Sequence, residues 1–394
     1  MRRPTARIPP RRCALADSAW LPLAGIRVVD FSLFVPGPFC ASILADLGAE
    51  VIKVESPGGD PGRSYIAVQF RTENRNKRSL AVNLKAPEAK AIVQRLAREC
   101  DIALEGFRPG VAERLGIGAA ALRQYNARLI YCSISGYGQS GPWRERPGHD
   151  VNYVAAAGAL AYPGQWLQPP VRSSIAIADM GGGSAAAIAV LAALAERART
   201  GRGVRLDLSL FETAFFWAAM RHGLDPAADP KAHIFPVNDV FETRDGERLT
   251  LGILEQHFWE NFLRFVPELA DARFATDAGR RAHGDALSAQ LAAVMRTRTT
   301  AEWIALCEAH DVPVDRCLTP AQAAELEQIR VRGGVASRGS ERFALFPVHA
   351  DGARGGSLRR GVPRLGEHSR EILVELGFDD AQIAELVRSG AVKT

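Results

Sequence analysis

Short apolar runs that favour strands alternate with helical stretches in the first third of the chain. Ile26–Phe31 and Glu50–Glu55 are rich in β-branched residues and indicate buried strands. Between them, Pro36–Pro38 is expected to end the first strand. Phe39–Leu47 then has the pattern of a helix that ends at Gly48. This order predicts two parallel strands joined by a right-handed crossover.

The same alternation continues along the chain and predicts further elements. They are helices at Pro87–Cys100, Ala119–Asn126, Ser184–Arg199 and Phe211–Arg221, and strands at Ile102–Glu105, Leu129–Ser135 and Val204–Leu208. We therefore expect residues 21–223 to form a large doubly wound α/β domain. No G-x-G-x-x-G motif follows the first strand, so the sequence does not indicate a dinucleotide site.

The pattern changes after residue 223. Residues 224–236 are polar and Pro-rich, which is typical of a linker, and Asp239–Leu254 has the pattern of a hairpin that turns at Asp245-Gly246. Helices are expected at Phe258–Phe265, Asp285–Met295, Thr300–Ala309 and Ala321–Gln328, and a closing pair at Arg370–Leu376 and Asp380–Ser389. We expect a smaller α+β domain over residues 237–330, followed by a Gly/Arg-rich segment.

The net charge says less about the partners of the chain than its size suggests. The chain has 394 residues, of which 47% are hydrophobic and 24% charged, enough to bury a large core in two or three domains. Of the net charge of +5, residues 1–17 carry +4, so the other 377 residues carry about +1 together. The excess lies in a tail, and we expect no nucleic-acid partner. Residues 1–20 are predicted to be a flexible basic extension, with an organelle transit segment as the alternative.

Cysteine spacing and hydropathy bear on location. The six cysteines are widely scattered, with no C-x-x-C pair and no histidine at metal-ligand spacing, which predicts reduced, mostly buried thiols, a cytoplasmic protein and no metal site. The most apolar stretch, Ala185–Ala195, is too short to cross a bilayer and is followed by Glu196. We therefore expect no membrane span.

One group of residues combines an acid/base side chain with a helix start. Gly148, His149 and Asp150 follow a predicted strand and a Gly-rich loop, and Tyr153 comes three residues later. Unpaired N–H groups at a helix start suit an oxyanion, and a histidine suits proton transfer near neutral pH. The alternatives are a core histidine for His149 and a helix cap for Asp150.

Two further carboxylates stand at element boundaries. Asp179 precedes three glycines and a predicted helix, and glycines let a ligand approach the backbone closely. Glu255 follows a predicted strand and precedes a helix. Helix capping is the alternative for both, and close helix packing is the alternative for the glycines.

Several basic residues lie near the ends of predicted strands, where doubly wound sheets bind ligands. They are Arg75, Lys77, Arg78, Lys85, Arg108 and Arg114. Arginine and lysine at such positions suit phosphates, and a solvated basic face is the alternative. The sequence has no G-x-S-x-G, P-loop or H-E-x-x-H motif and no cysteine in an activating context, so it gives no sign of the corresponding hydrolases.

Seven segments together resemble CoA-transferase family III, the superfamily that also contains the α-methylacyl-CoA racemases. They are Leu23–Phe31, Leu44–Glu55, Asn76–Ser79, Glu105–Gly110, Gly148–Tyr153, Asp179–Ser184 and Leu365–His368. The resemblance implies an acyl-CoA substrate and no separate cofactor. It also implies a large Rossmann-like domain, a smaller domain, an interlocked homodimer, and a segment over residues 331–394 that returns to the large domain.

Within this superfamily the resemblance implies two alternative chemistries. The motif G-H-D-x-N-Y of the racemases is matched by Gly148, His149, Asp150, Asn152 and Tyr153. In racemases the matching histidine and an aspartate at the position of Asp179 exchange the α-proton. We add the hypothesis that backbone N–H groups near Asp150, at the predicted helix start, face the thioester oxygen. In transferases the matching aspartate is a nucleophile that forms an aspartyl-CoA thioester.

Two other features favour the racemase. Glu255 matches a racemase G-A-L-E pattern and would orient His149, and Ala232–Asn238 lacks the glycine-rich loop of the transferases. We therefore expect a racemase of 2-methylacyl-CoA thioesters, with a CoA-transferase as the alternative. The residues expected to bind CoA are Arg75, Lys77, Arg78, Lys85, Gly106, Phe107, Arg108, Arg114, Gly148 and Tyr153. Ser56 departs from the family, which often has a basic residue there.

Overall fold

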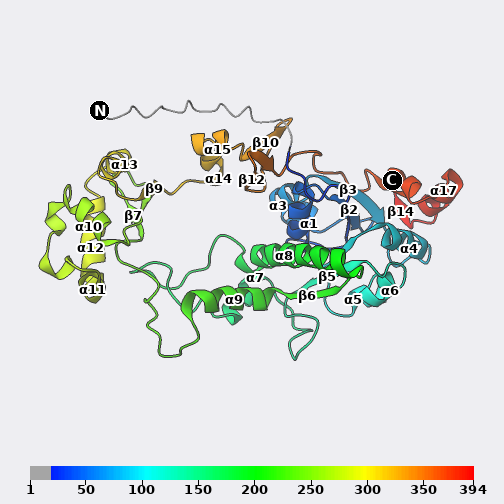
Figure 1. Cartoon of the computed structure of the whole chain (residues 1–394), viewed down its shortest axis with the longest axis horizontal. Coiled ribbons are helices and arrows are strands. Elements are labelled where there is room, and N and C mark those ends of the chain that lie inside the picture. The colour runs from blue at the N-terminus through cyan, green and yellow to red at the C-terminus, as the bar shows by residue number, and fades with distance from the viewer. Residues whose placement is uncertain (1–18) are drawn as a thin grey trace, which may run out of the picture. The chain divides into compact units, whose positions relative to one another are not determined.

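A mostly parallel sheet and a small antiparallel sheet organise the two units of the chain (Figure 1). The computed structural model describes residues 19–394, so nearly all of the predicted basic extension lies outside the described residues. The first unit contains residues up to Glu145 together with Met180–Leu208 and Leu326–Thr394. The second contains Arg146–Asp179 and Ser209–Glu325.

The central sheet belongs to the first unit and has seven strands. They are β1 (Arg27–Asp30), β2 (Glu50–Glu55), β3 (Lys77–Val82), β4 (Ile102–Glu105), β5 (Ile130–Ser135), β6 (Arg205–Ser209) and β14 (Val392–Lys393), in the order β14-β3-β2-β1-β4-β5-β6. Val28 in β1 pairs with Val51 on one side and Ile102 on the other, and all three are buried. The run from β3 to β6 has the order of doubly wound sheets, with its reversal between β1 and β4. The predicted α/β class with a largely parallel sheet is confirmed.

Helices cover this sheet and complete its core. They are α1 (Pro36–Asp46), α2 (Gly62–Tyr65), α3 (Ala67–Glu73), α4 (Ala89–Glu99), α5 (Val111–Arg114), α6 (Ala119–Arg123), α8 (Ile177–Thr200), α16 (Ser369–Glu375) and α17 (Asp380–Arg388). The short helix α15 (Glu327–Val331) belongs to the same unit and has no buried residue. Leu96 of α4, Leu373 of α16 and Ile383 of α17 join one buried cluster with Leu80 of β3. Figure 1 shows β14 and α17 side by side, and β14 pairs with β3, although the two strands lie far apart in the sequence.

Several element boundaries differ from the sequence prediction, and two helix starts and one missed strand bear on the site. β1 ends before Pro36 as expected, but α1 begins at Pro36 rather than at Phe39, because a missing N–H costs nothing at the first helical position. α8 begins at Ile177 rather than at Ser184, so Asp179 lies inside its first turn. β3 was not predicted, because Lys77 and Arg78 interrupt the apolar pattern, yet both are buried.

The second unit carries α7 (Asp150–Ala156), α9 (Leu210–His222) and a three-stranded antiparallel sheet. The strands β7 (Val240–Glu242) and β8 (Arg248–Leu251) form the predicted hairpin, with Gly246 in the left-handed region at φ +74°. The third strand, β9 (Val314–Arg316), pairs with β8 and is too short for a sequence signal.

The remaining helices enclose a separate core. They are α10 (Gln256–Leu263), α11 (Asp277–Ala282), α12 (Gly284–Met295) and α13 (Thr300–Ala309), with two 3₁₀ turns at Pro267–Leu269 and Ala272–Phe274. The short helix α14 (Pro320–Ala323) also belongs to this unit and has no buried residue. Trp259 and Trp303 are fully buried at its centre. The helix expected over Ala321–Gln328 is instead two short ones, α14 and α15. The first unit adds the hairpins β10 (Val335–Arg338)/β11 (Glu341–Ala344) and β12 (Val348–Ala350)/β13 (Ala353–Gly355).

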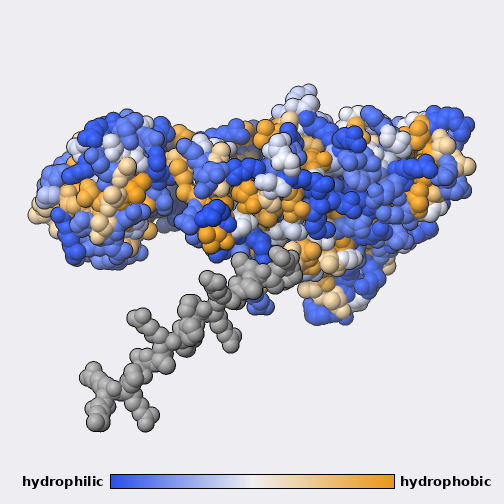
Figure 2. All heavy atoms as spheres, turned by 90° about the horizontal axis from the view of Figure 1, so that it is seen from above, coloured by the Kyte–Doolittle hydropathy of each residue, from blue (hydrophilic) through white to orange (hydrophobic). Residues whose placement is uncertain are grey.

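The cysteines and the longest helix bear on the predicted location. Cys40, Cys100, Cys132, Cys307 and Cys317 are free, and all but Cys317 are buried, which confirms the thiol prediction for the described residues. In the described part of the chain, α8 is the one helix with the length and hydropathy to cross a membrane, longer than the apolar run in the sequence. Core helices have the same properties, and 44% of its most apolar window is buried inside the protein. Figure 2 shows one face of the molecule, where polar residues surround small groups of apolar ones.

Candidate active site

Asp150 links the start of α7 to the start of α8. Its Oδ1 atom accepts hydrogen bonds from the backbone N–H groups of Ala178, at 2.7 Å, and Asp179, at 3.3 Å. The first N–H groups of a helix have no partner within it, so the buried Asp150 side chain caps α8 from another helix. Asp150 therefore does act as a helix cap, but for α8 rather than for α7, which it begins, and the cap fixes the backbone that carries Asp179.

The carboxyl group of Asp179 has an environment suited to proton transfer. It is half-buried in the first turn of α8. Burial and the nearby Asp150 carboxylate raise the pKa of Asp179 to about 7, and Arg172 opposes this shift. The guanidinium of Arg172 lies 3.8 Å from Asp150 Oδ2. A carboxyl with such a pKa is present both with and without its proton at neutral pH, as acid/base catalysis requires.

His149 is the N-cap residue of α7 and is exposed. Its backbone N–H donates to Asn152 Oδ1 at 3.0 Å, so Asn152 holds the turn that carries the histidine. The exposure excludes the alternative of a buried core histidine. The structure thus places His149 and Asp179 at the starts of two helices that are joined through Asp150.

Gly148 and Tyr153 brace the same turn. The Tyr153 hydroxyl donates to the Gly148 carbonyl at 2.6 Å, and a Cβ on Gly148 would lie 2.6 Å from the tyrosine ring. Only glycine allows this approach. Both residues were predicted to bind CoA. In the structure, the contacts between Gly148 and Tyr153 instead position His149.

Glu255 does not contact His149 in the structure. It is exposed at the N-cap of α10, and no contact of its carboxylate with His149 is present among the described residues. The predicted orienting role of Glu255 rests on the resemblance alone.

Three of the predicted phosphate ligands are engaged in ion pairs within the first unit. Lys77 is fully buried, and its Nζ donates at 3.0 Å to Asp30, to Asn74 and to the Pro38 carbonyl. All three ammonium donors are thereby used. The side chain of Lys77 is therefore not available to a ligand in this structure.

The two neighbouring arginines are committed in the same way. Arg75 is buried and pairs with Asp46 at 2.5 Å. Arg78 is bound by three carboxylates, those of Glu50, Glu371 and Glu375. Burial lowers the pKa of Arg78, but these carboxylates outweigh it and raise the pKa. Because β3 was missed, the sequence analysis did not place Lys77 and Arg78 at the amino end of a strand, away from the ligand-binding edge.

Two other predicted cations do meet at a cavity. Lys85, which follows β3, and Arg114, which ends α5, line a cavity of about 510 Å³ in the first unit. Lys90 of α4 and Tyr125 also line it. The sequence analysis missed Lys90 because it falls inside a predicted helix, where a lysine is ordinarily a solvated surface residue. The cavity therefore offers three cations and an aromatic ring to one ligand.

The loop after β4 stands where the strand order reverses, the usual ligand crevice of doubly wound sheets. A Cβ on Gly106 would lie 3.4 Å from Ser32, which follows β1. The backbone N–H of Phe107 donates to the buried Glu105 carboxylate at 2.8 Å, and Arg108 is exposed. Burial raises the pKa of Glu105 to about 7. Phe34, with φ +61° and 41% exposed, stands after the neighbouring strand β1.

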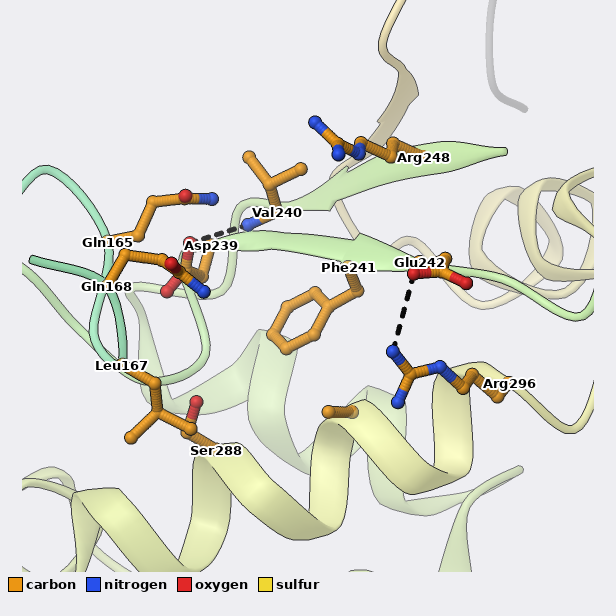
Figure 3. Close-up of a pocket in the computed structure, with 11 residues that line it drawn as sticks. Gln165, Leu167, Gln168, Asp239, Val240, Phe241, Glu242, Arg248, Ser288 and Arg296 are labelled. Carbon is orange, nitrogen blue, oxygen red and sulfur yellow. Dashed lines mark hydrogen bonds and ion pairs between the residues drawn. The ribbon is translucent and has the colours of Figure 1, made fainter. Parts of the chain in front are cut away.

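A further cavity contains none of the predicted residues. It has a volume of about 350 Å³ and lies between the β7–β8 hairpin and α12 (Figure 3). Its charges are largely paired, since Asp239 accepts from two backbone N–H groups and Glu242 faces Arg296 at 3.4 Å. No three His, Cys, Asp or Glu side chains are grouped to hold a metal ion anywhere in residues 19–394.

Because this fold serves many functions, the family of the chain comes from its similarity to known families. A family model described as CoA-transferase family III matches residues 23–369. The chain belongs to this family. The members of family III are racemases or CoA-transferases that use CoA thioesters, so this family III chain is an enzyme of one of these two kinds. The resemblance stated from the sequence is confirmed.

Relatives of both kinds are similar over almost the whole family III chain. An acyl-CoA transferase of Fusarium pseudograminearum is 36% identical, over 96% of this chain and 90% of the relative. The α-methylacyl-CoA racemase of Homo sapiens is 32% identical, over 92% of this chain and 96% of the relative. Among solved structures, a CAIB/BAIF family protein from Brucella suis has a TM-score of 0.80 and 29% identity, covering 90% of this chain and 99% of that one.

Proposed function

We propose that this family III enzyme is a racemase of 2-methylacyl-CoA thioesters, in which His149 and Asp179 exchange the proton on the α-carbon. The observation that carries the proposal is the Asp150 carboxylate, which caps α8 at Asp179 from the helix start next to His149. The Asp150 carboxylate thereby joins the turn that carries the His149 imidazole to the helix start that carries Asp179, and both kinds of side chain serve as general acids and bases.

Inversion of a carbon centre needs a base on one face and an acid on the other. In one direction Asp179 removes the α-proton as a carboxylate and His149 returns a proton as imidazolium, and in the other direction the roles reverse. The pKa of Asp179 of about 7 supports this, because both of its forms are then populated at working pH. Asn152 and Tyr153 position His149 through the turn described above.

The CoA portion is assigned to a smaller set of residues than the sequence suggested. Lys85, Lys90 and Arg114 would bind its phosphates in the 510 Å³ cavity. Gly106, Phe107 and Arg108 would follow the CoA chain at the crevice between β1 and β4. Arg75, Lys77 and Arg78 are withdrawn from this set because carboxylates and carbonyls already occupy them.

A CoA-transferase with Asp179 as nucleophile is the second candidate, since the relative from Fusarium pseudograminearum is named an acyl-CoA transferase. A nucleophilic carboxylate must be ionised, and burial beside Asp150 reduces its ionised fraction at neutral pH. Proton exchange uses both forms, so the environment of Asp179 supports the racemase more strongly.

We also propose a homodimer that works in the cytoplasm. α9 presents large apolar side chains to solvent in this single chain, with Phe216 60%, Trp217 46% and Met220 74% exposed. Such a patch on one helix supports a contact with a second copy. The free, mostly buried cysteines support the location.

The deciding experiment follows deuterium at the α-carbon. The enzyme is incubated in heavy water with a 2-methylacyl-CoA, and the thioester is analysed by mass spectrometry and chiral separation. We expect deuterium uptake with loss of optical purity, abolished by Asp179→Asn and by His149→Gln. His283→Gln, a change of another exposed histidine in the same unit, should have no effect.

Two results would overturn the racemase. The first is the absence of exchange at any enzyme concentration. The second is an adduct of CoA mass on Asp179, formed with a donor thioester and consumed by a carboxylic acid, which would establish the transferase instead.

A further inference from the structure

Arg172 lies in the loop between α7 and α8, next to the carboxylate that links the starts of these two helices. Its guanidinium is 3.8 Å from Asp150 Oδ2, while Asp150 Oδ1 accepts the N–H groups that begin α8. The Arg172 side chain is 59% exposed, and within residues 19–394 its guanidinium makes no hydrogen bond. Its N–H donors are therefore available to a ligand.

The charges around this position are predominantly negative. Asp150 and Asp179 stand at the starts of α7 and α8. Burial and then the Asp150 carboxylate raise the pKa of Asp179, and Arg172 is the one cation among the described residues that lowers it. The two carboxyl groups are thus balanced by a single permanent cation.

The proposed racemisation adds a further negative charge at this place. When the Asp179 carboxylate removes the α-proton, the electron pair of the C–H bond forms the carbon–carbon double bond of an enolate, and the carbonyl pair moves onto the thioester oxygen. When the His149 imidazolium returns a proton to the opposite face, that pair returns to the carbonyl bond. An enolate oxygen at the start of α7 would lie close to the Asp150 carboxylate, and two negative charges at short distance repel each other unless a cation is present.

We propose that Arg172 is a catalytic residue of the racemase, whose guanidinium donates to the enolate oxygen of the thioester and neutralises its charge. The inference rests on the proposed function and adds a residue to it. Arginine suits this task because it stays charged at every working pH and carries several donors in one plane. The Asp150 carboxylate holds this cation with one oxygen and the start of α8 with the other, so it places both the cation and Asp179.

The apolar residues of the same loop suit an acyl group. Leu167, Val171 and Ile175 are 50%, 63% and 64% exposed, so three large apolar side chains of this loop face solvent. Contact with the alkyl chain of a 2-methylacyl group would cover such side chains and exclude water. The lower local dielectric would strengthen the attraction between Arg172 and the enolate oxygen.

The test separates this role from the effect of Arg172 on the pKa of Asp179. Deuterium exchange with a 2-methylacyl-CoA is measured over the complete pH profile for the wild type and for Arg172→Gln. A residue that acts only on that pKa moves a limb of the profile and leaves the pH-independent value of kcat unchanged. We expect this value to fall by about ten- to a hundred-fold with KM nearly unchanged, because the interaction forms only as the enolate forms. The partial exposure of Arg172 keeps the loss below that of a buried oxyanion donor.

Two variants and one added ion show whether the charge itself matters. Arg172→Lys should retain part of the lost rate, and low concentrations of guanidinium chloride should restore part of the activity of Arg172→Ala. Arg296→Gln is the matched control, because Arg296 belongs to the same unit, is 57% exposed and lies 3.4 Å from the Glu242 carboxylate. This variant should exchange deuterium at the wild-type rate.

An equilibrium titration measures enolate stabilisation without turnover. 2-Methylacetoacetyl-CoA has an acidic α-proton, and its enolate absorbs in the near ultraviolet. Bound to the wild-type enzyme, this analogue should form its enolate at lower pH than in water. In Arg172→Gln the midpoint should move up by about one to two pH units, which corresponds to the expected loss in kcat.

The inference and the proposed function fail in different ways. If the wild-type enzyme exchanges no deuterium, the racemase proposal is wrong and the inference falls with it. If the wild type exchanges and Arg172→Gln keeps the same pH-independent kcat, or raises KM alone, Arg172 does not stabilise the enolate while the racemase stands. A loss of rate that neither lysine nor guanidinium restores would also overturn the inference, since it would indicate a purely structural role.

Discussion

The pKa of Asp179 depends in part on its neighbour Asp150, which also has a structural role. Asp150 accepts the first N–H groups of α8, and its negative charge adds to the effect of burial in keeping the pKa of Asp179 high. Arg172, 3.8 Å from Asp150, acts in the opposite direction. The protonation of the proposed acid/base group is therefore adjustable from both sides by single substitutions.

Two substitutions should shift the pH profile of deuterium exchange in opposite directions. Asp150→Asn keeps an oxygen acceptor for α8 but removes the charge, so the pKa of Asp179 should fall and its limb should move to lower pH by about one unit. Arg172→Gln removes an opposing cation, so the limb should move to higher pH. A limb that stays fixed in both variants would assign it to a group other than Asp179.

Two lysines of the first unit should respond differently to the same change. Lys77→Met leaves the buried Asp30 without its 3.0 Å partner, which should cost about 3–5 kcal/mol of unfolding free energy in urea titrations. Lys85→Met, at an exposed position on the proposed CoA cavity, should leave stability within about 0.5 kcal/mol.

Calorimetric CoA binding completes this comparison. Lys85→Met should weaken CoA binding by about ten-fold through loss of a phosphate contact. Binding to the folded fraction of Lys77→Met should be unchanged. The reverse pattern would return Lys77 to the CoA site.

At the scale of elements, the glycines at the start of α8 are explained by packing. A Cβ on Gly183 would lie 2.6 Å from the Pro36 carbonyl oxygen and 2.8 Å from the Phe39 ring, where α8 crosses the start of α1. Close helix packing was one of the alternatives from the sequence, and it holds for this glycine.

The substitution Gly183→Ala has two opposing effects on stability, one through helix propensity and one through this packing. Propensity alone would stabilise the helix by about 1 kcal/mol. The clash with backbone should prevail and destabilise the protein by about 1–3 kcal/mol in urea titrations. Gly164→Ala, where an added Cβ meets nothing within 4 Å, is the control and should be near neutral. A stabilised Gly183→Ala would show that α1 and α8 can separate at little cost.

Elements whose apolar run contains only isolated charges, such as the buried Lys53 of β2, are predictable from the sequence, whereas two adjacent buried charges hide the pattern. The pattern predicts Glu50–Glu55, Ile102–Glu105 and Thr300–Ala309 with the bounds that β2, β4 and α13 have. β3 is not predicted because burial of Lys77 and Arg78 depends on ion pairs with residues that are remote in the sequence. Asp30 pairs with Lys77, and three glutamates pair with Arg78.

The residues of the candidate site also differ in whether the sequence alone predicts them. His149, Asp150 and Asp179 are recognisable because their motifs are local in the sequence. Which cations face a ligand depends on distant ion pairs, so Arg75 and Lys85 look alike in the sequence and differ in the structure. Arg172 belongs to no local motif, and its position beside Asp150 emerges only from the fold.

At the scale of the whole molecule, the exposed face of α9 bears on assembly. Phe216, Trp217 and Met220 leave much apolar area in solvent in a single chain. A second copy that covers these side chains would bury their apolar area, and the burial would stabilise the contact by about 25 cal/mol per Å².

Met220→Glu tests that assembly. A carboxylate at this position would be buried in the proposed homodimer, so the variant should become monomeric at micromolar concentration in light-scattering measurements. Val331→Glu, at an exposed apolar position on α15, should remain dimeric. A monomeric wild-type enzyme would contradict the homodimer.

The boundary between the two units has a practical consequence for dissecting this enzyme. The second unit is assembled from Arg146–Asp179 and Ser209–Glu325, and its first piece ends at Asp179, inside an unbroken helix. No single cut of the gene can therefore isolate that unit with both pieces. A shortened protein would have to rejoin Asp179 to Ser209 by a new linker, and would separate the aspartate from the helix that now extends beyond it.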